Sequence, residues 1–243
     1  MSVHTNSKLY RRFDGFRNTS FLWEGLLNDL QIFEKAELAI SEHPQVNASP
    51  TIRLGKLVEE FVLFEMAQDE SIKILQSNIQ VFRERITIGE LDCLINKSSA
   101  NTHLEIVYKF YLYDPSFTEE LDRWIGPNRK DSLVLKLRKL KEKQLPLLHQ
   151  PETIKILDHL HIDSSQCIQQ VYFKAQLFVP YQAITSTYPL VNKDCIKGFY
   201  IRQSELRLFE ELVFYIPAKL DWLAEPYTDV EWLSAKYCFS DSF

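Results

Sequence analysis

The chain has 243 residues, of which 45% are hydrophobic and 13% aromatic, and its formal net charge is -5. This length and composition are enough for one large domain with a real core, and scarce glycine (6 residues) argues against a disordered or repeat protein. The acidic balance does not indicate a nucleic-acid-binding protein, although an acidic protein can carry a local basic surface.

The four cysteines lie far apart, with no CxxC pair and no zinc-ligand spacing. This spacing favours a reduced, intracellular protein. The N-terminus has no apolar signal region, and no apolar run is long enough to span a membrane. We therefore expect a cytoplasmic protein without a membrane partner.

The first half of the chain is predicted to pass from helix to strand. Residues 10–41 are predicted to be mostly helical, because their apolar residues recur with a period of about 3.6. A polar linker at 45–50 precedes an amphipathic helix at about 52–69. Glu59 lies at the border of its buried face, where a solvated carboxylate is an equal alternative to a functional one.

A β-meander is predicted next, with strands at 79–85, 86–95 and 103–112 and a polar turn at 96–101. A glycine-proline turn at 124–131 leads into a helix that ends near Gln144, with Asp131 or Ser132 as its cap. Between Arg123 and Lys143, basic residues outnumber acidic ones by six. A short helix at 152–161 follows, then strands at 168–179, 198–202 and 212–216, and a closing helix at 227–237.

Charged residues gather on two of these strands. Successive strand residues point to opposite faces, so Glu90 and Asp92 share one face, and His103, Glu105 and Lys109 share one face of the next strand. If the strands are neighbours, three carboxylates and an ammonium converge. Because burying such charges unpaired is costly, this pattern predicts a metal site.

These motifs resemble the PD-(D/E)XK nuclease superfamily. A helix with Glu59 precedes a strand that ends in G-x-x-D at 89–92, and the next strand carries Glu105. The usual lysine position is Val107, and the lysine is Lys109, one pleat further along. The resemblance implies an α/β (α+β) fold with a restriction-endonuclease-like mixed-sheet core (α-β-β-β-α), flanked by helices and extended by C-terminal strands.

The chain also resembles a bacterial family, domain of unknown function 1853, over nearly its whole length. The resemblance rests on short motifs in one order: Leu54-Gly55 with Glu59, Gly89–Asp92, His103–Leu112, Trp124–Pro127 with Asp131, Lys136, Gln144-Leu145, Gly198–Tyr200 and Lys219–Leu223. On this basis we divide the chain into an N-terminal helical segment (1–50), a PD-(D/E)XK-like core (51–165) and C-terminal strands with a helix on the same domain (166–243).

Carried onto this chain, the nuclease resemblance implies that Glu59, Asp92 and Glu105 bind Mg²⁺ or Mn²⁺. Asp92, Glu105 and Lys109 would be catalytic, with Lys109 positioning the nucleophilic water or the phosphate. The candidate accessory residues are Glu90, His103 and Gln144, and for His103 a place at the edge of the core is an equal alternative. The candidate nucleic-acid-binding residues are Arg129, Lys130, Lys136, Lys139 and Lys143.

Two functions follow. The first is a metal-dependent nuclease that hydrolyses phosphodiester bonds in DNA, or less readily RNA. The second is a catalytically inactive protein of the same fold that binds nucleic acid or a protein partner. Val107 at the usual lysine position favours the second, and the joint presence of the three carboxylates with Lys109 favours the first.

Overall fold

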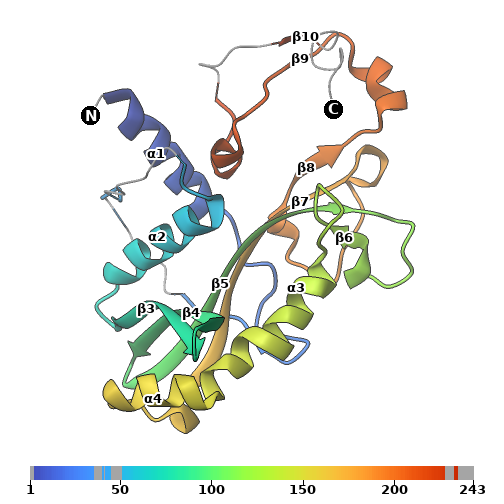
Figure 1. The fold of residues 1–243 in the computed structure, drawn as a ribbon. Coiled ribbons are helices and arrows are strands. Elements are labelled where there is room, and N and C mark those ends of the chain that lie inside the picture. Colours follow the sequence, from blue (N-terminus) through green and yellow to red (C-terminus); the bar gives the residue numbers. More distant parts are fainter. Residues whose placement is uncertain (1–2, 36–39, 41, 45–50, 228–232, 235–243) are drawn as a thin grey trace.

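The computed structural model describes residues 3–35, 40, 42–44, 51–227 and 233–234. Its centre is a six-stranded mixed sheet (Figure 1). Five strands follow one another in the order β3 (Ile72–Arg83), β4 (Ile86–Lys97), β5 (Ala100–Tyr113), β7 (Ile168–Pro180) and β8 (Ile196–Tyr200), and β6 (Trp124–Ile125) pairs with the end of β5. Helices cover both faces of this sheet, so the predicted α+β class is confirmed.

The N-terminal segment departs from the prediction. Helix α1 (Val3–Arg17) is present, but the chain then forms only a small hairpin, β1 (Leu26–Leu27) with β2 (Leu30–Gln31). Phe21 and Ile32 form β-bridges to residues of β7 instead. The helix predicted over 10–41 is therefore wrong in the described residues after Arg17, because the apolar residues there are buried along a strand rather than on a helix face.

The helix and the meander follow the prediction closely. Helix α2 (Leu54–Ala67) packs its apolar side against the sheet. Strands β3 (Ile72–Arg83), β4 (Ile86–Lys97) and β5 (Ala100–Tyr113) are consecutive and antiparallel, with β3 starting seven residues before the predicted strand.

A crossover carries the chain from β5 to β7. It contains η1 (Leu121–Arg123), β6 (Trp124–Ile125), α3 (Leu133–Lys139), a π-turn η2 (Leu140–Gln144), η3 (Leu145–His149), α4 (Pro151–His159) and η4 (Ser164–Gln166). Of the two predicted caps, Asp131 and Ser132, the structure has Ser132, whose side chain accepts a hydrogen bond from the Leu135 N–H at 3.3 Å. Strand β7 (Ile168–Pro180) then pairs in parallel with β5.

The C-terminal part extends the same sheet. Strand β8 (Ile196–Tyr200) pairs in parallel with β7, between the short helices η5 (Tyr181–Ala183), η6 (Lys193–Cys195), η7 (Gln203–Phe209) and η8 (Lys219–Leu223). Strand β9 (Val213–Phe214) pairs with β10 (Leu233–Ser234). The closing helix predicted at 227–237 is wrong at Leu233–Ser234, and most of its other positions lie outside the described residues.

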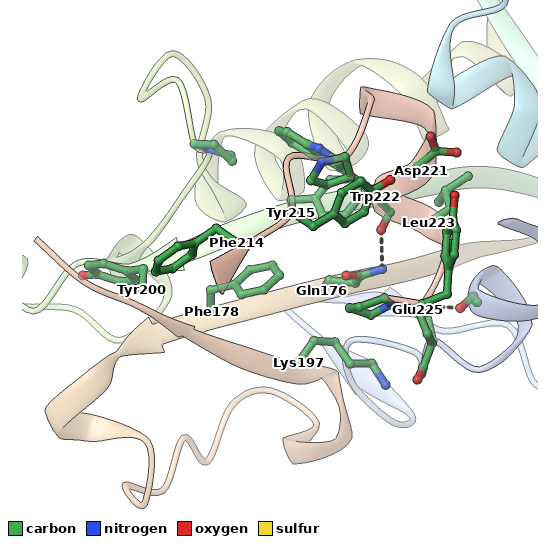
Figure 2. Close-up of a pocket in the computed structure, with 18 of the residues that line it drawn as sticks. Gln176, Phe178, Lys197, Tyr200, Phe214, Tyr215, Asp221, Trp222, Leu223 and Glu225 are labelled. Carbon is green, nitrogen blue, oxygen red and sulfur yellow. Dashed lines mark hydrogen bonds between the residues drawn. The ribbon is translucent and has the colours of Figure 1, made fainter. Parts of the chain in front are cut away.

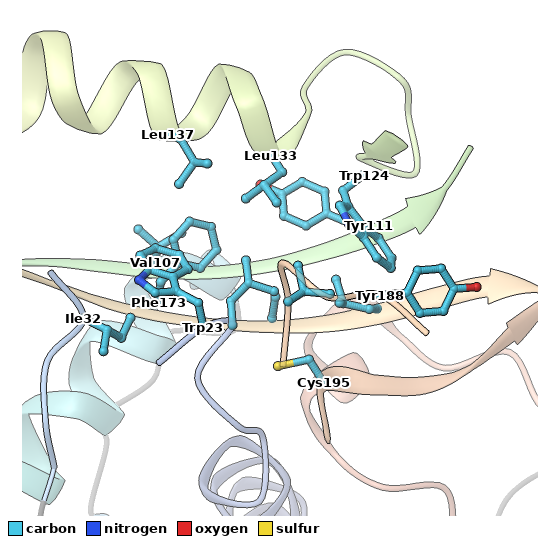
Figure 3. Packing of buried hydrophobic residues seen from close by; sticks show 14 of the residues in the cluster. Trp23, Ile32, Val107, Tyr111, Trp124, Leu133, Leu137, Phe173, Tyr188 and Cys195 are labelled. Atoms are coloured by element: carbon cyan, nitrogen blue, oxygen red, sulfur yellow. The ribbon is translucent and has the colours of Figure 1, made fainter. Parts of the chain in front are cut away.

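Successive side chains of β5 point to opposite faces of the sheet and pack into two separate apolar cores. Val107 and Tyr111 pack against Leu133 and Leu137 of α3 on one face (Figure 3), whereas Tyr108 packs with α1 and α2 on the other. In the described part of the chain, we find no helix with the length and apolarity needed to cross a membrane.

Candidate active site at the fork between β4 and β5

The sheet divides at Asp92 and Glu105. Strand β4 stays paired with β3 along almost its whole length, but its ladder with β5 ends at the pair Cys93 and Leu104. Asp92 and Glu105 are the first residues beyond that pair, one on each strand. On its other edge β5 continues beside β7 as far as Leu112, so the two carboxyl groups lie where the β3–β4 hairpin leaves the rest of the sheet.

Asp92 closes the end of the ladder with its side chain. Its Oδ2 accepts a hydrogen bond from the Ile106 N–H at 2.8 Å. Burial, with smaller contributions from the neighbouring Glu105 and Glu59, raises the pKa of Asp92 to about 7, while the Ile106 N–H and Lys136 oppose the shift. Without a cation, the pair is therefore disposed to retain a proton near neutral pH.

Glu105 is fully buried. Burial raises its pKa to about 7, against the opposing effects of Lys136, a hydrogen bond with Asp92, and Lys139. Each of the two neighbouring carboxyl groups thus influences the pKa of the other.

Donors from two directions hold the Glu105 carboxyl. His103 Nε2 lies 3.1 Å from Oε1, and the Gln144 amide nitrogen donates to Oε2. Gln144 Oε1 in turn accepts from Lys136 Nζ at 2.7 Å. His103 and Gln144, both predicted residues, therefore contact Glu105 directly. Lys136, also predicted, contacts Gln144.

Lys136 is the cation that faces the pair. It lies on α3, whose neighbouring residues Leu133 and Leu137 are anchored in the core. Burial lowers the pKa of Lys136 to about 8, although Glu105 and Asp92 both favour its charged form. A half-buried lysine beside two carboxyls is placed to meet a phosphate oxygen or a water molecule.

Lys109 makes a different contact from the one predicted. Its Nζ lies 2.7 Å from Asp131 Oδ2, at the end of the loop that follows β6. Gly126 makes room for this carboxylate, since a Cβ there would lie 1.8 Å from Asp131 Oδ1. The predicted catalytic role of Lys109 stays a prediction, and in the structure the lysine is engaged by the loop.

The remaining acidic candidates are paired with neighbouring side chains. Glu59 Oε2 accepts from Lys56 Nζ at 3.0 Å, and Glu90 Oε2 accepts from Gln80 Nε2 at 2.5 Å. Within the described ranges, no group of three or more His, Cys, Asp or Glu side chains is arranged to hold a metal ion. Of the three predicted ligands, the structure therefore brings Asp92 and Glu105 together and places Glu59 near them.

The predicted basic residues fall into two groups. Lys139 and Lys143 are exposed on the helical run that also carries Lys136. Arg129 and Lys130 lie on the loop after β6, where Arg129 is bonded to Asp114 at 2.8 Å. The helical group is the nearer one, because Lys139 contributes to the pKa of Glu105.

A cavity of about 650 Å³ lies on the opposite face of the sheet (Figure 2). Its walls include Phe110, together with Gln176, Phe178 and Trp222, which Figure 2 labels. Phe110 and Glu105 point to opposite faces of β5, and none of the predicted site residues lines this cavity. The carboxyl pair is therefore a separate feature.

Sequence reasoning missed one residue of the site, Gln169. It lies on β7, 64 positions after Glu105, and reaches His103 only because β5 and β7 pair in parallel. No local motif marks it. Its detection needs the strand register that the crossover produces.

A protein-family model described as "Domain of unknown function (DUF1853)" matches residues 19–239. This match confirms the resemblance inferred from the ordered motifs. Searches of curated proteins and of solved structures found no match.

Proposed function

Because the chain belongs to the DUF1853 family, whose description assigns no activity, we propose a function from the site itself: a metal-dependent nuclease that hydrolyses phosphodiester bonds in DNA. One observation carries the proposal. Asp92 and Glu105 meet at the fork between two strands, and Lys136 is held against the pair through Gln144.

The pair fits Mg²⁺ or Mn²⁺ in its chemistry. Magnesium prefers oxygen ligands and is commonly held by one or two protein carboxylates together with waters and substrate phosphates. Asp92 and Glu105 supply that number of carboxylates, and a bound cation would replace the proton that burial otherwise keeps on the pair. Glu59 adds negative charge nearby without a direct bond to either.

Each residue has a part in the hydrolysis. A bound cation would supply Lewis acidity, polarising the phosphate and lowering the pKa of a water molecule. Asp92 and Glu105 would hold the cation at the fork, and the ammonium of Lys136 would stabilise charge on the phosphate during in-line attack by water. The exposed basic residues Lys139 and Lys143 of the helical run, together with Arg129 and Lys130 of the loop after β6, would neutralise the nucleic-acid backbone.

A second candidate is a protein of this fold that binds nucleic acid without cutting it. The observation in its favour is the incomplete ligand set: no three metal-ligating side chains cluster in the described part of the chain, and Glu59 is paired with Lys56. The basic helix would then serve binding alone.

Cleavage assays separate the two candidates. Single-stranded and double-stranded DNA and RNA are incubated with Mg²⁺ or Mn²⁺ and with the wild type or its variants. We expect Asp92→Asn and Glu105→Gln to lower the cleavage rate by about 100-fold or more, and Lys136→Met by about 10²–10³-fold, as for loss of a charge-stabilising donor.

Lys141→Met is the matched control, because Lys141 lies on the same helical run but is exposed and bonded to Asp29. It should retain wild-type cleavage. Equal cleavage by wild type and Asp92→Asn would assign the activity to a contaminant and overturn the proposal. DNA binding by every protein, with cleavage by none, would establish the second candidate instead.

A further inference from the structure

Four hydrogen bonds and the peptide bond between Gln144 and Leu145 form a closed ring that includes the Glu105 carboxyl. His103 Nε2 lies 3.1 Å from Glu105 Oε1, and the amide nitrogen of Gln169 lies 3.1 Å from His103 Nδ1. The same nitrogen donates to the Leu145 carbonyl at 2.6 Å. Leu145 follows Gln144 in the chain, and Gln144 donates to Glu105 Oε2, which closes the ring.

The chemistry of the ring fixes the direction of each bond. The Leu145 carbonyl can only accept, so the atom of Gln169 that faces it must be the amide nitrogen. That nitrogen also faces His103 Nδ1, which must therefore be the acceptor. The proton of the imidazole is then on Nε2, and His103 donates to Glu105.

The same reasoning fixes the orientation of the Gln144 amide, which lies between Lys136 and Glu105. The Lys136 ammonium can only donate, so the atom of Gln144 that faces it is the amide oxygen. The Gln144 nitrogen then faces Glu105. Both oxygens of the Glu105 carboxylate thus receive a proton donor, one from the strand side and one from the helix side.

Gln169 connects the two sides. His103 and Gln169 are direct partners across the parallel ladder of β5 and β7, so their side chains stand next to one another on one face. The bond to Leu145 ties the same amide to the helical run that carries Lys136 and Gln144. Its amide group therefore sets both the orientation of His103 and the distance between helix and strand.

We propose that Gln169 is a positioning residue for Glu105, acting through His103 and Leu145. The inference rests on the proposed metal-dependent function. The ring holds the carboxylate in one rotamer before a cation arrives, so the ordering cost of binding is already met. Outer partners of this kind typically change metal affinity or activity by about 10–100-fold when they are removed.

Mn²⁺ binding without DNA tests the inference, with electron paramagnetic resonance to count free and bound ion. We expect Gln169→Leu to weaken Mn²⁺ binding by about 10–100-fold. Gln169→Asn keeps an amide but is one methylene shorter, and we expect an intermediate loss. Gln170→Leu is the matched control, because Gln170 is the next residue of β7 and points to the opposite face. It should bind Mn²⁺ like the wild type.

A merely structural role would give a different result. In that case Gln169→Leu would lower the urea midpoint of the metal-free protein while the Mn²⁺ affinity of its folded fraction stayed at the wild-type value, and the inference would be overturned. If Gln169→Leu does not fold, Gln169→Asn decides alone: wild-type Mn²⁺ affinity in that variant also overturns the inference.

The experiment separates this inference from the proposed function through Asp92→Asn. If the wild type binds Mn²⁺ no better than Asp92→Asn does, the metal function fails and the inference falls with it. If Asp92→Asn abolishes binding while Gln169→Leu and Gln170→Leu both bind like the wild type, the metal site stands and only the role of Gln169 is rejected.

Discussion

The substitution Asp92→Asn is expected to stabilise the metal-free protein above neutral pH, although it removes the proposed activity. Asparagine has the shape of aspartate, so its amide oxygen can still accept from the Ile106 N–H, as Oδ2 does now. Its amide nitrogen would then face Glu105 and donate to that carboxylate. The variant keeps the ladder contact and removes one of two coupled negative charges.

The magnitude follows from the raised pKa. Asp92 has a pKa of about 7 in the folded protein, against roughly 4 for an unfolded chain. Between these values the folded state binds more protons than the unfolded state, so stability falls as pH rises. The stability that comes from the neutral form is complete below about pH 4 and is lost as pH passes 7.

The full shift corresponds to about 4 kcal/mol, at roughly 1.4 kcal/mol per pKa unit. Because Asp92 has already lost part of this stability at pH 5, we expect a smaller effect: between pH 5 and pH 8 the substitution should gain about 2–3 kcal/mol relative to wild type. A metal ion bound to the wild type would offset the stability that is lost when Asp92 ionises.

Urea unfolding with EDTA at pH 5 and pH 8 measures this difference. The control is Asp158→Asn, on the exposed side of α4, which should show the same stability as wild type at both pH values. With Mn²⁺ added at pH 8, the wild type should gain stability and Asp92→Asn should not. A variant that is no more stable, relative to wild type, at pH 8 than at pH 5 would refute the reasoning.

Three further substitutions test the supports of the site by urea unfolding. Gly89→Ala should cost about 1–3 kcal/mol, because its Cβ would lie 2.6 Å from Leu147 Cδ2; an unchanged midpoint would contradict this contact. Gly126→Ala should cost less, about 0.5–1 kcal/mol, because the exposed Asp131 carboxylate can move away from Lys109, and removing that carboxylate by Asp131→Ala should reduce the cost. Ser132→Ala removes the cap of α3 and should cost about 1 kcal/mol, whereas Ser132→Asp should restore most of it.

The neighbourhood of Asp92 and Glu105 could be predicted from the sequence because it depends on local rules. The meander is short, its turn composition is polar, and the left-handed backbone of Ser98 and Ser99 closes the β4–β5 hairpin. From that turn, counting along both strands makes Asp92 and Glu105 register neighbours. Alternation then places each carboxyl relative to the core.

The helical half of the site could not be predicted in the same way. Lys136 and Gln144 are eight residues apart, and in a regular α-helix this spacing overshoots two turns by roughly 80°. The π-turn over Leu140–Gln144 contains more residues per turn and takes up the excess, so the two side chains meet. Periodicity alone gives no sign of such a turn. The same applies to the segment after α1, whose apolar period fits a helix but whose residues pair with β7.

The burial of Val107 accounts for the origin of the lysine beside the carboxyl pair, Lys136, which lies on helix α3 and not on strand β5. A lysine in place of Val107 would have to occupy a site that is 3% exposed and packed in the core beneath Leu137 (Figure 3). Burying an ammonium in that core would carry a desolvation cost of several kcal/mol. The helix that covers Val107 instead presents Lys136, the residue before Leu137, at the rim of the same core. Anchoring Leu137 in the core above the strand therefore places Lys136 beside Glu105.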